Sequence, residues 1–309
     1  MLDARQLDAL AAVIDHGSFG AAAKALNITL AAVSLRIKSL EAGMGQRLLV
    51  RGKQVRATPA GQALLGHVKR VRLMEADLLE GSPLTPGGQK PWQSLSVAVN
   101  ADSLTSWFLP GVAAVAQKHR LLLDLVIDDQ DHTHDALSSG AVTGCVTTLA
   151  HSIRGCVAEA LGVMRYRCVA SPKFVAQWGG VSSPARIASP HDLLRGPAVI
   201  FNRKDTLQDA FLAQHCQLRG AVYPRHFVPA VDAFEVAIEL GMGWGMMSEL
   251  HLAARAHRLP LQEVMPGCTV DVMLYWQHWS REAVAAQRLT QAVRQAAHQR
   301  LLPAPSENT

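Results

Sequence analysis

The stretch that decides the fold of the N-terminal region is residues 18–41, SFGAAAKALNITLAAVSLRIKSLE. Ser18 is a typical N-cap for a helix over 19–26, which is rich in alanine. Asn27 and Ile28 form a short turn, and Thr29 caps a further helix that runs to about Ala42. Two helices across so short a turn predict a helix-turn-helix, because alanine side chains allow the close approach that this packing requires.

Further elements surround this motif. A helix over 2–15 precedes it, with Leu7, Leu10 and Ile14 at helical spacing. The exposed side of the helix after Thr29 would enter a major groove of DNA. Residues 48–57 predict a two-stranded wing whose cations reach phosphates, which position a protein without reading sequence. A plain helical domain is the alternative, and the basic wing disfavours it. The expected DNA-contacting residues are Ser18, Thr29, Leu30, Ala31, Ser34, Leu35, Arg36, Lys38, Arg51, Lys53 and Arg56.

The charge of the chain is divided unevenly. The 309 residues carry a net charge of +5. Residues 1–72 hold 11 Lys and Arg against four acids, a net +7, which leaves −2 for the remainder. A basic unit on a near-neutral body favours nucleic-acid binding at the N-terminal end and a different function in the remainder of the chain. A solvated basic face would give the same net charge.

The ordered motifs carry a family resemblance. The segments 18–26, 32–41 and 45–48, followed by Thr58-Pro59-Ala60-Gly61, resemble the winged helix-turn-helix of LysR-type transcriptional regulators. In that family the second and seventh residues of the third helix are commonly polar, whereas here they are Leu30 and Leu35. Leucine offers only apolar contact, for example to thymine methyl groups. Either these leucines read A/T-rich DNA, which is our hypothesis, or they pack against another chain.

A long helix is predicted from Thr58 to about Glu80. Its apolar residues fall at steps of three and four: Gly61, Leu64, Val68, Val71, Met74 and Leu78. Such a stripe favours a partner helix, and hence a dimer, over packing onto the helix's own chain. Residues 81–88, rich in glycine and proline, predict a linker.

The C-terminal body alternates strands and helices. Expected strands cover 95–99, 121–127 (as a buried strand), 142–147, 198–201, 226–228, 243–247 and 270–276, with helices over 106–118, 131–139, 206–215, 230–240 and 282–301. This rhythm predicts two α/β lobes. The whole chain is an α+β multidomain protein, and the resemblance implies a two-lobed effector domain like that of periplasmic binding proteins.

We therefore expect three regions. Residues 1–58 form the winged helix-turn-helix and 59–90 a dimerisation helix and hinge. Residues 91–302 form the effector-binding domain, with lobe one at 91–165 plus 270–302 and lobe two at 166–269.

More local motifs narrow the resemblance. The segments 98–107, 162–166, 241–246 and 274–276 resemble the subgroup of lysine and arginine export regulators. That resemblance implies lysine or arginine as effector and an exporter gene as target. It also implies double-stranded DNA as partner, a homodimer or tetramer, and a possible contact with RNA polymerase. A regulator for another small metabolite is the alternative.

The local chemistry agrees with a cationic ligand. Acids and hydroxyls follow several predicted strands, and ligands of open α/β sheets bind beyond the carboxyl ends of strands. A basic amino acid needs carboxylates for its cations and donors for its carboxylate. Any single Asp here could equally be a helix cap. The expected effector-binding residues are Asp102, Ser103, Asp129, Gln130, Asp131, Thr147, Thr148, Asn202, Asp205 and Asp232.

Other function classes lack support in the sequence. Five scattered cysteines with no C-x-x-C pair favour a reducing cytoplasm over disulfides or zinc. No apolar run reaches the ~18 residues of a membrane span, and Asp3, Asp8 and Asp15 stand where a signal peptide would be apolar. That also disfavours a solute-binding protein. No nucleophile motif occurs, so we expect no catalytic residue, metal or cofactor.

Overall fold

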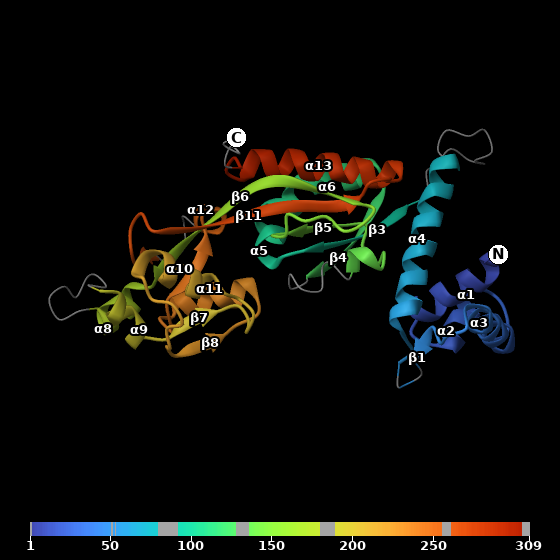
Figure 1. Cartoon of the computed structure of the whole chain (residues 1–309), viewed down its shortest axis with the longest axis horizontal. Helices are drawn as coiled ribbons and strands as arrows, with labels where there is room; N and C mark the ends of the chain where they lie inside the picture. Colours follow the sequence, from blue (N-terminus) through green and yellow to red (C-terminus); the bar gives the residue numbers. More distant parts are fainter. Residues whose placement is uncertain are drawn as a thin grey trace.

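The computed structural model describes residues 2–50, 52, 54–79, 92–127, 136–179, 189–254 and 261–304. Figure 1 shows an extended molecule in which a helical head lies at one end and two lobes form the body. The long helix α4 stands between the head and the nearer lobe. The head thus has its own core, and α4 is the described element that contacts both parts.

Three helices and a short hairpin form the head. They are α1 (Ala4–Asp15), α2 (Phe19–Ala25), α3 (Leu30–Met44), β1 (Leu49–Val50) and β2 (Arg56–Ala57). The side chains of Ser18 and Thr29 accept hydrogen bonds from the backbone N–H groups of Ala21 and Ala32, at 3.2 and 3.1 Å. These contacts satisfy donors that helix starts leave unpaired, which confirms the predicted caps.

The turn between α2 and α3 fixes their angle. Asn27 adopts a φ of 53°, a left-handed conformation that asparagine tolerates better than most residues. The inward side of α3 then buries Val33, Ile37 and Leu40 against α1 and α2. The predicted helix-turn-helix and its buried face are therefore confirmed.

Helix α4 (Pro59–Leu79) packs on its own chain along much of its length. Leu64 and Val68 are buried against the head, whereas Met74 and Leu78 are 50% and 79% exposed. Leu73, which lies off the predicted stripe, is buried in the core of the body. The predicted apolar stripe is thus divided into two parts. The first part packs against the head of the same chain, and only Met74 and Leu78 remain exposed.

A mixed sheet forms the centre of lobe one. Its strands are β3 (Gln93–Val99), β4 (Leu121–Ile127), β5 (Gly144–Thr147), β6 (Cys156–Ala170) and β11 (Thr269–Trp279). With β10 (Gln262–Glu263), the strand order is β10-β6-β11-β5-β3-β4, which places β4 at an edge. The prediction of a buried strand at 121–127 is therefore wrong: Leu122, Val126 and Ile127 are 51%, 39% and 61% exposed.

Helices cover one face of this sheet (Figure 1). They are α6 (Leu109–Lys118) and α13 (Val284–Arg300), while α5 (Ala101–Ser103) and a π-helical turn (Leu104–Phe108) lead from the end of β3 into α6. A Cβ on Gly111 of α6 would lie 2.1 Å from the Cβ of Ala296 on α13. The absence of a side chain at Gly111 therefore lets the two helices approach closely.

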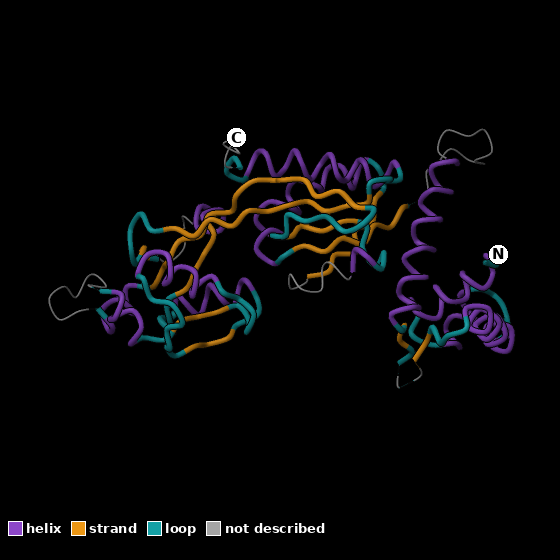
Figure 2. The backbone as a smooth tube through the Cα atoms, viewed as in Figure 1, coloured by secondary structure: helices purple, strands orange, loops and turns teal. Residues whose placement is uncertain are grey.

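Strands β6 and β11 connect the two lobes, as Figure 2 shows. They pair antiparallel from Thr269 with Arg167 to Trp279 with Cys156, with an irregularity between Leu274 and Tyr275. At the far end, β6 also pairs with β9 (Gly245–Ser248) and β10 (Gln262–Glu263). Strand β6, the longest in the described structure, was not predicted from the sequence.

Lobe two contains the remaining elements. They are α8 (Pro172–Trp178), α9 (Pro190–Arg195), β7 (Ala198–Ile200), α10 (Leu207–Cys216), β8 (Arg225–Phe227), α11 (Val231–Glu239) and α12 (Glu249–Ala254). Strands β7 and β8 are parallel, and Ala198 bridges to Trp244 just before β9. The predicted alternation of strand and helix is confirmed here, while α8, α9 and α12 were not predicted.

The described residues contain no single membrane-spanning helix and no cluster of metal-binding side chains. Among the described helices, none is by itself long and apolar enough to cross a membrane. Phe19–Ala25 and Leu30–Met44 reach the required length and apolar composition only when taken together, and they are bent by 108° relative to each other. No group of three or more His, Cys, Asp or Glu side chains in the described ranges is placed to hold a metal ion.

Candidate functional site

An acidic cavity lies where lobe one meets lobe two. It has a volume of about 30 Å³ and opens to solvent. The polar side chains that line it are Asp102 from lobe one and Asp205, Glu235 and His251 from lobe two. Its apolar lining consists of Phe201, Leu207, Val231, Phe234, Met246 and Met247. Among the described lining residues there are three carboxylates and no lysine or arginine, so the cavity is suited to a cation.

Asp102 is held at the centre of a polar network. Its Oδ2 accepts a 2.9 Å hydrogen bond from the Tyr166 hydroxyl, and its Oδ1 lies 3.6 Å from Nδ1 of His251. His251 is itself positioned by Thr105 at 2.9 Å and Ser248 at 3.1 Å. Burial raises the pKa of Asp102, while His251 and the Tyr166 hydroxyl partly oppose that rise. The carboxylate is thus poised to gain from a further cationic partner.

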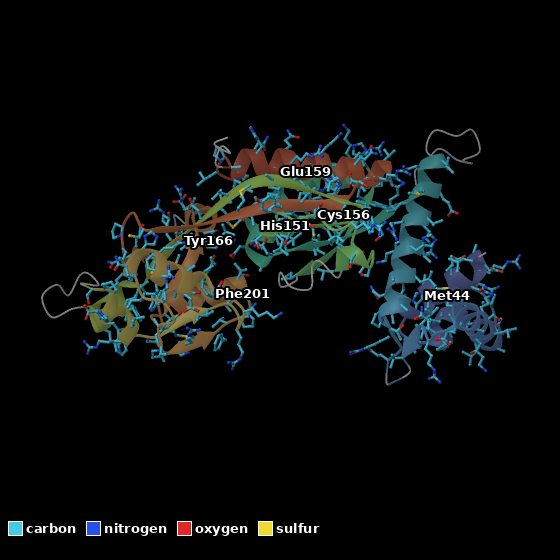
Figure 3. The ribbon with its side chains drawn as sticks, viewed as in Figure 1. Met44, His151, Cys156, Glu159, Tyr166 and Phe201 are labelled. Atoms are coloured by element: carbon cyan, nitrogen blue, oxygen red, sulfur yellow. The ribbon has the colours of Figure 1, made fainter. Side chains whose placement is uncertain are left out.

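The geometry of this network follows from the two lobes. Asp102 and Thr105 follow the end of β3 in lobe one, whereas His251 lies on α12 in lobe two. Tyr166 lies on β6 where that strand passes between the lobes, and Phe201 lies in lobe two, as labelled in Figure 3. The contacts of Asp102 therefore depend on the relative position of the two lobes.

Asp205 approaches the same cavity from the start of α10. Its carboxylate accepts hydrogen bonds from the backbone N–H groups of Phe201 at 3.2 Å and Leu207 at 3.0 Å. Burial raises its pKa, these two N–H groups lower it, and the charge of Asp102 raises it further. Asp205 is therefore both a helix cap and a wall of the cavity.

The structure brings together only part of the predicted effector set. Asp102 and Asp205 line the cavity, and Asn202 supports the turn before Asp205 by accepting its backbone N–H at 3.1 Å. Ser103 and Thr147 are buried, Thr148 is partly buried, and Asp232 is exposed on α11; none of these four lines the cavity. Asp129, Gln130 and Asp131 lie outside the described residues.

Three polar residues of the site were not predicted as site residues from the sequence. Tyr166 belongs to one of the segments that carry the family resemblance, while Glu235 and His251 lie on helices with no local signal of a ligand site. They converge on Asp102 and Asp205 only through the packing of α11 and α12 on the sheet. A long-range contact of this kind leaves no spacing pattern in the sequence.

The head presents a second candidate surface on α3. Leu30, Ala31, Leu35 and Lys38 are exposed on one side, with Ser34 and Arg36 partly buried. Ser18 and Thr29 serve as helix caps, and Arg56 is exposed on β2. Arg51 and Lys53 lie outside the described residues.

A winged helix-turn-helix joined to a two-lobed domain with a cavity between its lobes defines a ligand-responsive DNA-binding regulator. Residues 4–62 match the model of bacterial regulatory helix-turn-helix proteins of the lysR family, and residues 88–298 match the LysR substrate-binding domain. The chain belongs to the LysR family and is a DNA-binding transcriptional regulator.

Individual relatives extend over almost the whole chain. The HTH-type transcriptional regulator ArgP of Pseudomonas aeruginosa is 39% identical, covering 90% of each chain. The crystal structure of ArgP from Mycobacterium tuberculosis is similar with a TM-score of 0.81 and 37% identity, covering 98% of this chain and 100% of that one. Full-length LysG from Corynebacterium glutamicum with bound effector Arg has a TM-score of 0.71 and 32% identity, with 98% and 100% covered.

Proposed function

We propose that this regulator binds a basic amino acid, arginine or lysine, in the cavity between its lobes. The observation that carries the proposal is the set of three carboxylates, Asp102, Asp205 and Glu235, with no lysine or arginine among the described lining residues. Anionic side chains in a partly desolvated cavity attract a cationic ligand more strongly than they would in water. The Arg effector of the similar LysG structure supports the same ligand class.

The roles within the cavity follow from its chemistry. Asp102, with one oxygen bonded to Tyr166, accepts from the cationic group of the ligand. Asp205 and Glu235 add negative potential, and the apolar side chains of Phe201 and Met246 pack against the aliphatic part of the ligand. Since Asp102 belongs to lobe one and the others to lobe two, a bound ligand favours one relative position of the lobes.

The wider role is part of the same proposal. The regulator controls an exporter gene in the cytoplasm, acts as a dimer or tetramer on double-stranded DNA, and contacts RNA polymerase. It performs no catalysis and needs no cofactor. Residues 1–58 bind DNA, 59–90 connect and dimerise, and 91–302 bind the effector, with the lobes divided at 165/166 and 269/270. The two strands that join the lobes at these positions support that division.

Calorimetric titration of the full chain tests the effector. We expect arginine or lysine to bind and citrulline, which replaces the guanidinium by a neutral urea group, to bind at least about tenfold more weakly, a difference of about 1.4 kcal/mol. Asp102→Asn should weaken binding by a similar factor. Asp232→Asn is the matched control, since Asp232 is exposed on lobe two and does not line the cavity.

Three results would contradict the proposal. Equal binding of citrulline and arginine would show that the ligand's cation is not recognised. Equal loss of affinity in Asp102→Asn and Asp232→Asn would remove the cavity as the site. Binding of a different metabolite, with none of the basic amino acids, would indicate a regulator with another effector.

A further inference from the structure

Two leucines of α3, Leu30 and Leu35, are exposed on the surface of the head. Leu30 is 54% and Leu35 65% exposed, whereas Val33, Ile37 and Leu40, which face the core of the head, are at most 2% exposed. The core of the head is therefore complete without them. Large apolar side chains that bury nothing in the free chain gain stability only from a partner.

The neighbourhood of the leucines indicates the chemistry of that partner. Lys24, Lys38, Arg47 and Arg56 are all exposed on the head, and residues 1–72 carry a net charge of +7 against −2 for the remainder of the chain. Exposed cations on the same head as an apolar strip of the second helix of a helix-turn-helix suit a duplex, because the phosphates neutralise the cations while the helix lies in the major groove. The occupant is therefore double-stranded DNA rather than an apolar protein surface.

The side chains themselves limit what α3 can read. Positions 30, 31, 34, 35 and 38 share one side of the helix, and only Ser34 and Lys38 among them carry polar groups. Leucine and alanine can neither donate nor accept a hydrogen bond. The apolar group that a base pair exposes in the major groove is the C5-methyl of thymine.

We propose that Leu30 and Leu35 each contact a thymine methyl group, so that the operator preference at these positions depends on methyl contacts instead of hydrogen bonds. The contacts give thymine an advantage over cytosine, which lacks the methyl group, and over uracil, which has the same hydrogen-bonding edge without it. Lys38 and Arg56 then supply phosphate contacts that are independent of sequence. The inference rests on DNA binding by the family and is independent of the proposed effector.

Removal of single methyl groups tests this inference directly. The preferred duplex is first selected from a randomised pool with the full-length protein. Each thymine is then replaced in turn by deoxyuridine. We expect about a fourfold loss of affinity at specific thymines in each half-site, which corresponds to about 0.8 kcal/mol for one buried methyl-sized group, and little change elsewhere.

Variants assign the contacts to residues. Leu35→Ala should abolish the deoxyuridine penalty at one position and Leu30→Ala at another. Leu2→Ala, which removes a leucine that is 42% exposed on the same head, should leave the whole profile unchanged. Arg56→Ala should weaken all duplexes alike and reduce the dependence of affinity on salt, because it removes a phosphate contact.

The outcomes separate the alternatives. A profile without any penalty for deoxyuridine, or no preferred duplex at all, would overturn the inference. So would penalties that persist unchanged in both leucine variants. A changed oligomeric state of Leu35→Ala with an unchanged deoxyuridine profile would show that the leucine packs on a second copy of the chain. Arginine titration of the same samples tests the proposed effector separately, so that a failure of the methyl-contact inference and a failure of the proposed effector can be distinguished.

Discussion

The hydroxyl of Tyr166 donates a 2.9 Å hydrogen bond to Oδ2 of Asp102, across the boundary between a connecting strand and the start of α5. Tyr166 is buried, with 4% of its surface exposed, and sits where β6 leaves its partner β11 and gains β9. The acid proposed to hold the ligand cation is thereby tied to the strand that joins the lobes.

Tyr166→Phe should weaken arginine binding by about three- to tenfold near pH 6 and much less near pH 8.5. The hydroxyl lowers the pKa of Asp102, so its removal lets burial raise that pKa further. More of the carboxyl is then protonated at low pH, and a neutral carboxyl attracts no cation. Calorimetric titration across this pH range measures the effect.

Tyr223→Phe is the matched control for this prediction. Its hydroxyl donates a 2.7 Å hydrogen bond to Asp209, outside the lining of the cavity. We expect arginine affinity to keep the pH dependence of the original protein. A loss in Tyr166→Phe that is equal at pH 6 and pH 8.5 would mean that the hydroxyl acts on packing and not on the charge of Asp102.

Gly61→Ala should disrupt the junction between the wing and α4. A Cβ at this position would lie 2.0 Å from the carbonyl oxygen of Leu48, which already accepts the backbone N–H of Thr58 at 2.9 Å. The overlap is with backbone, so the hairpin or the helix must move, at a cost of about 1–3 kcal/mol. Denaturant unfolding measures the loss, and DNA affinity should fall at least about tenfold.

Gly43→Ala provides the control for that substitution. Gly43 lies within α3 and nothing is within 4 Å of its virtual Cβ, so alanine should stabilise the helix by up to about 1 kcal/mol. If both glycine variants bind DNA as the original protein does, the close contact of Gly61 is not required for the position of the wing.

Asp77→Ala should loosen the contact between α4 and lobe one. Oδ2 of Asp77 accepts a 2.8 Å hydrogen bond from the backbone N–H of Val284, the first residue of α13. Ala283, the N-cap of α13, offers no side-chain acceptor, so Asp77 caps the helix from another element. Loss of a cap costs about 1 kcal/mol. Thermal unfolding of Asp77→Ala should show a lower midpoint than Glu75→Ala, an exposed neighbour on α4; equal midpoints would contradict the capping role.

Local signals explain why the head could be predicted from the sequence. Ser18 and Thr29 cap their helices through neighbours three residues away, and the buried positions of α3 follow helical periodicity. The edge position of β4 had no such signal, because an apolar run does not distinguish an edge strand from a central one. Strand β6 was missed because its polarity does not alternate and Gly162 interrupts it with a φ of 136°.

The residues of the candidate cavity likewise include some that local sequence predicts and others that it does not. Asp102 and Asp205 were predicted because both follow strand ends, a property of the local sequence. His251 reaches Asp102 from 149 positions further along the chain, through the packing of α12 against the π-helical turn and β6. Contacts of that separation depend on the three-dimensional arrangement of the lobes, which periodicity does not encode.

His278 lies in a buried charged network of lobe one. Its Nε2 is 3.1 Å from Glu159 and its Nδ1 3.2 Å from Glu282, and its side chain is 7% exposed. Burial opposes the charged imidazole, but the hydrogen bonds to Glu282 and Glu159 outweigh it and raise the pKa above the ordinary value of 6.5. For Glu159, burial is outweighed by Arg294 and His278, which hold its pKa below 4.5. The folded structure therefore favours the charged forms of both His278 and Glu159.

His278→Gln should destabilise the protein in a pH-dependent manner. A raised pKa in the folded state means that the stabilisation by His278 is complete below about pH 6.5 and is lost as the pH rises through the higher folded value. The difference in free energy of unfolding from the original protein should therefore be largest near pH 6, about 1–3 kcal/mol for a lost buried partner, and smaller near pH 9. His298→Gln, at an exposed position of α13, should show no such trend. A difference for His278→Gln that stays constant or grows toward pH 9 would show that the imidazole is neutral in the folded chain.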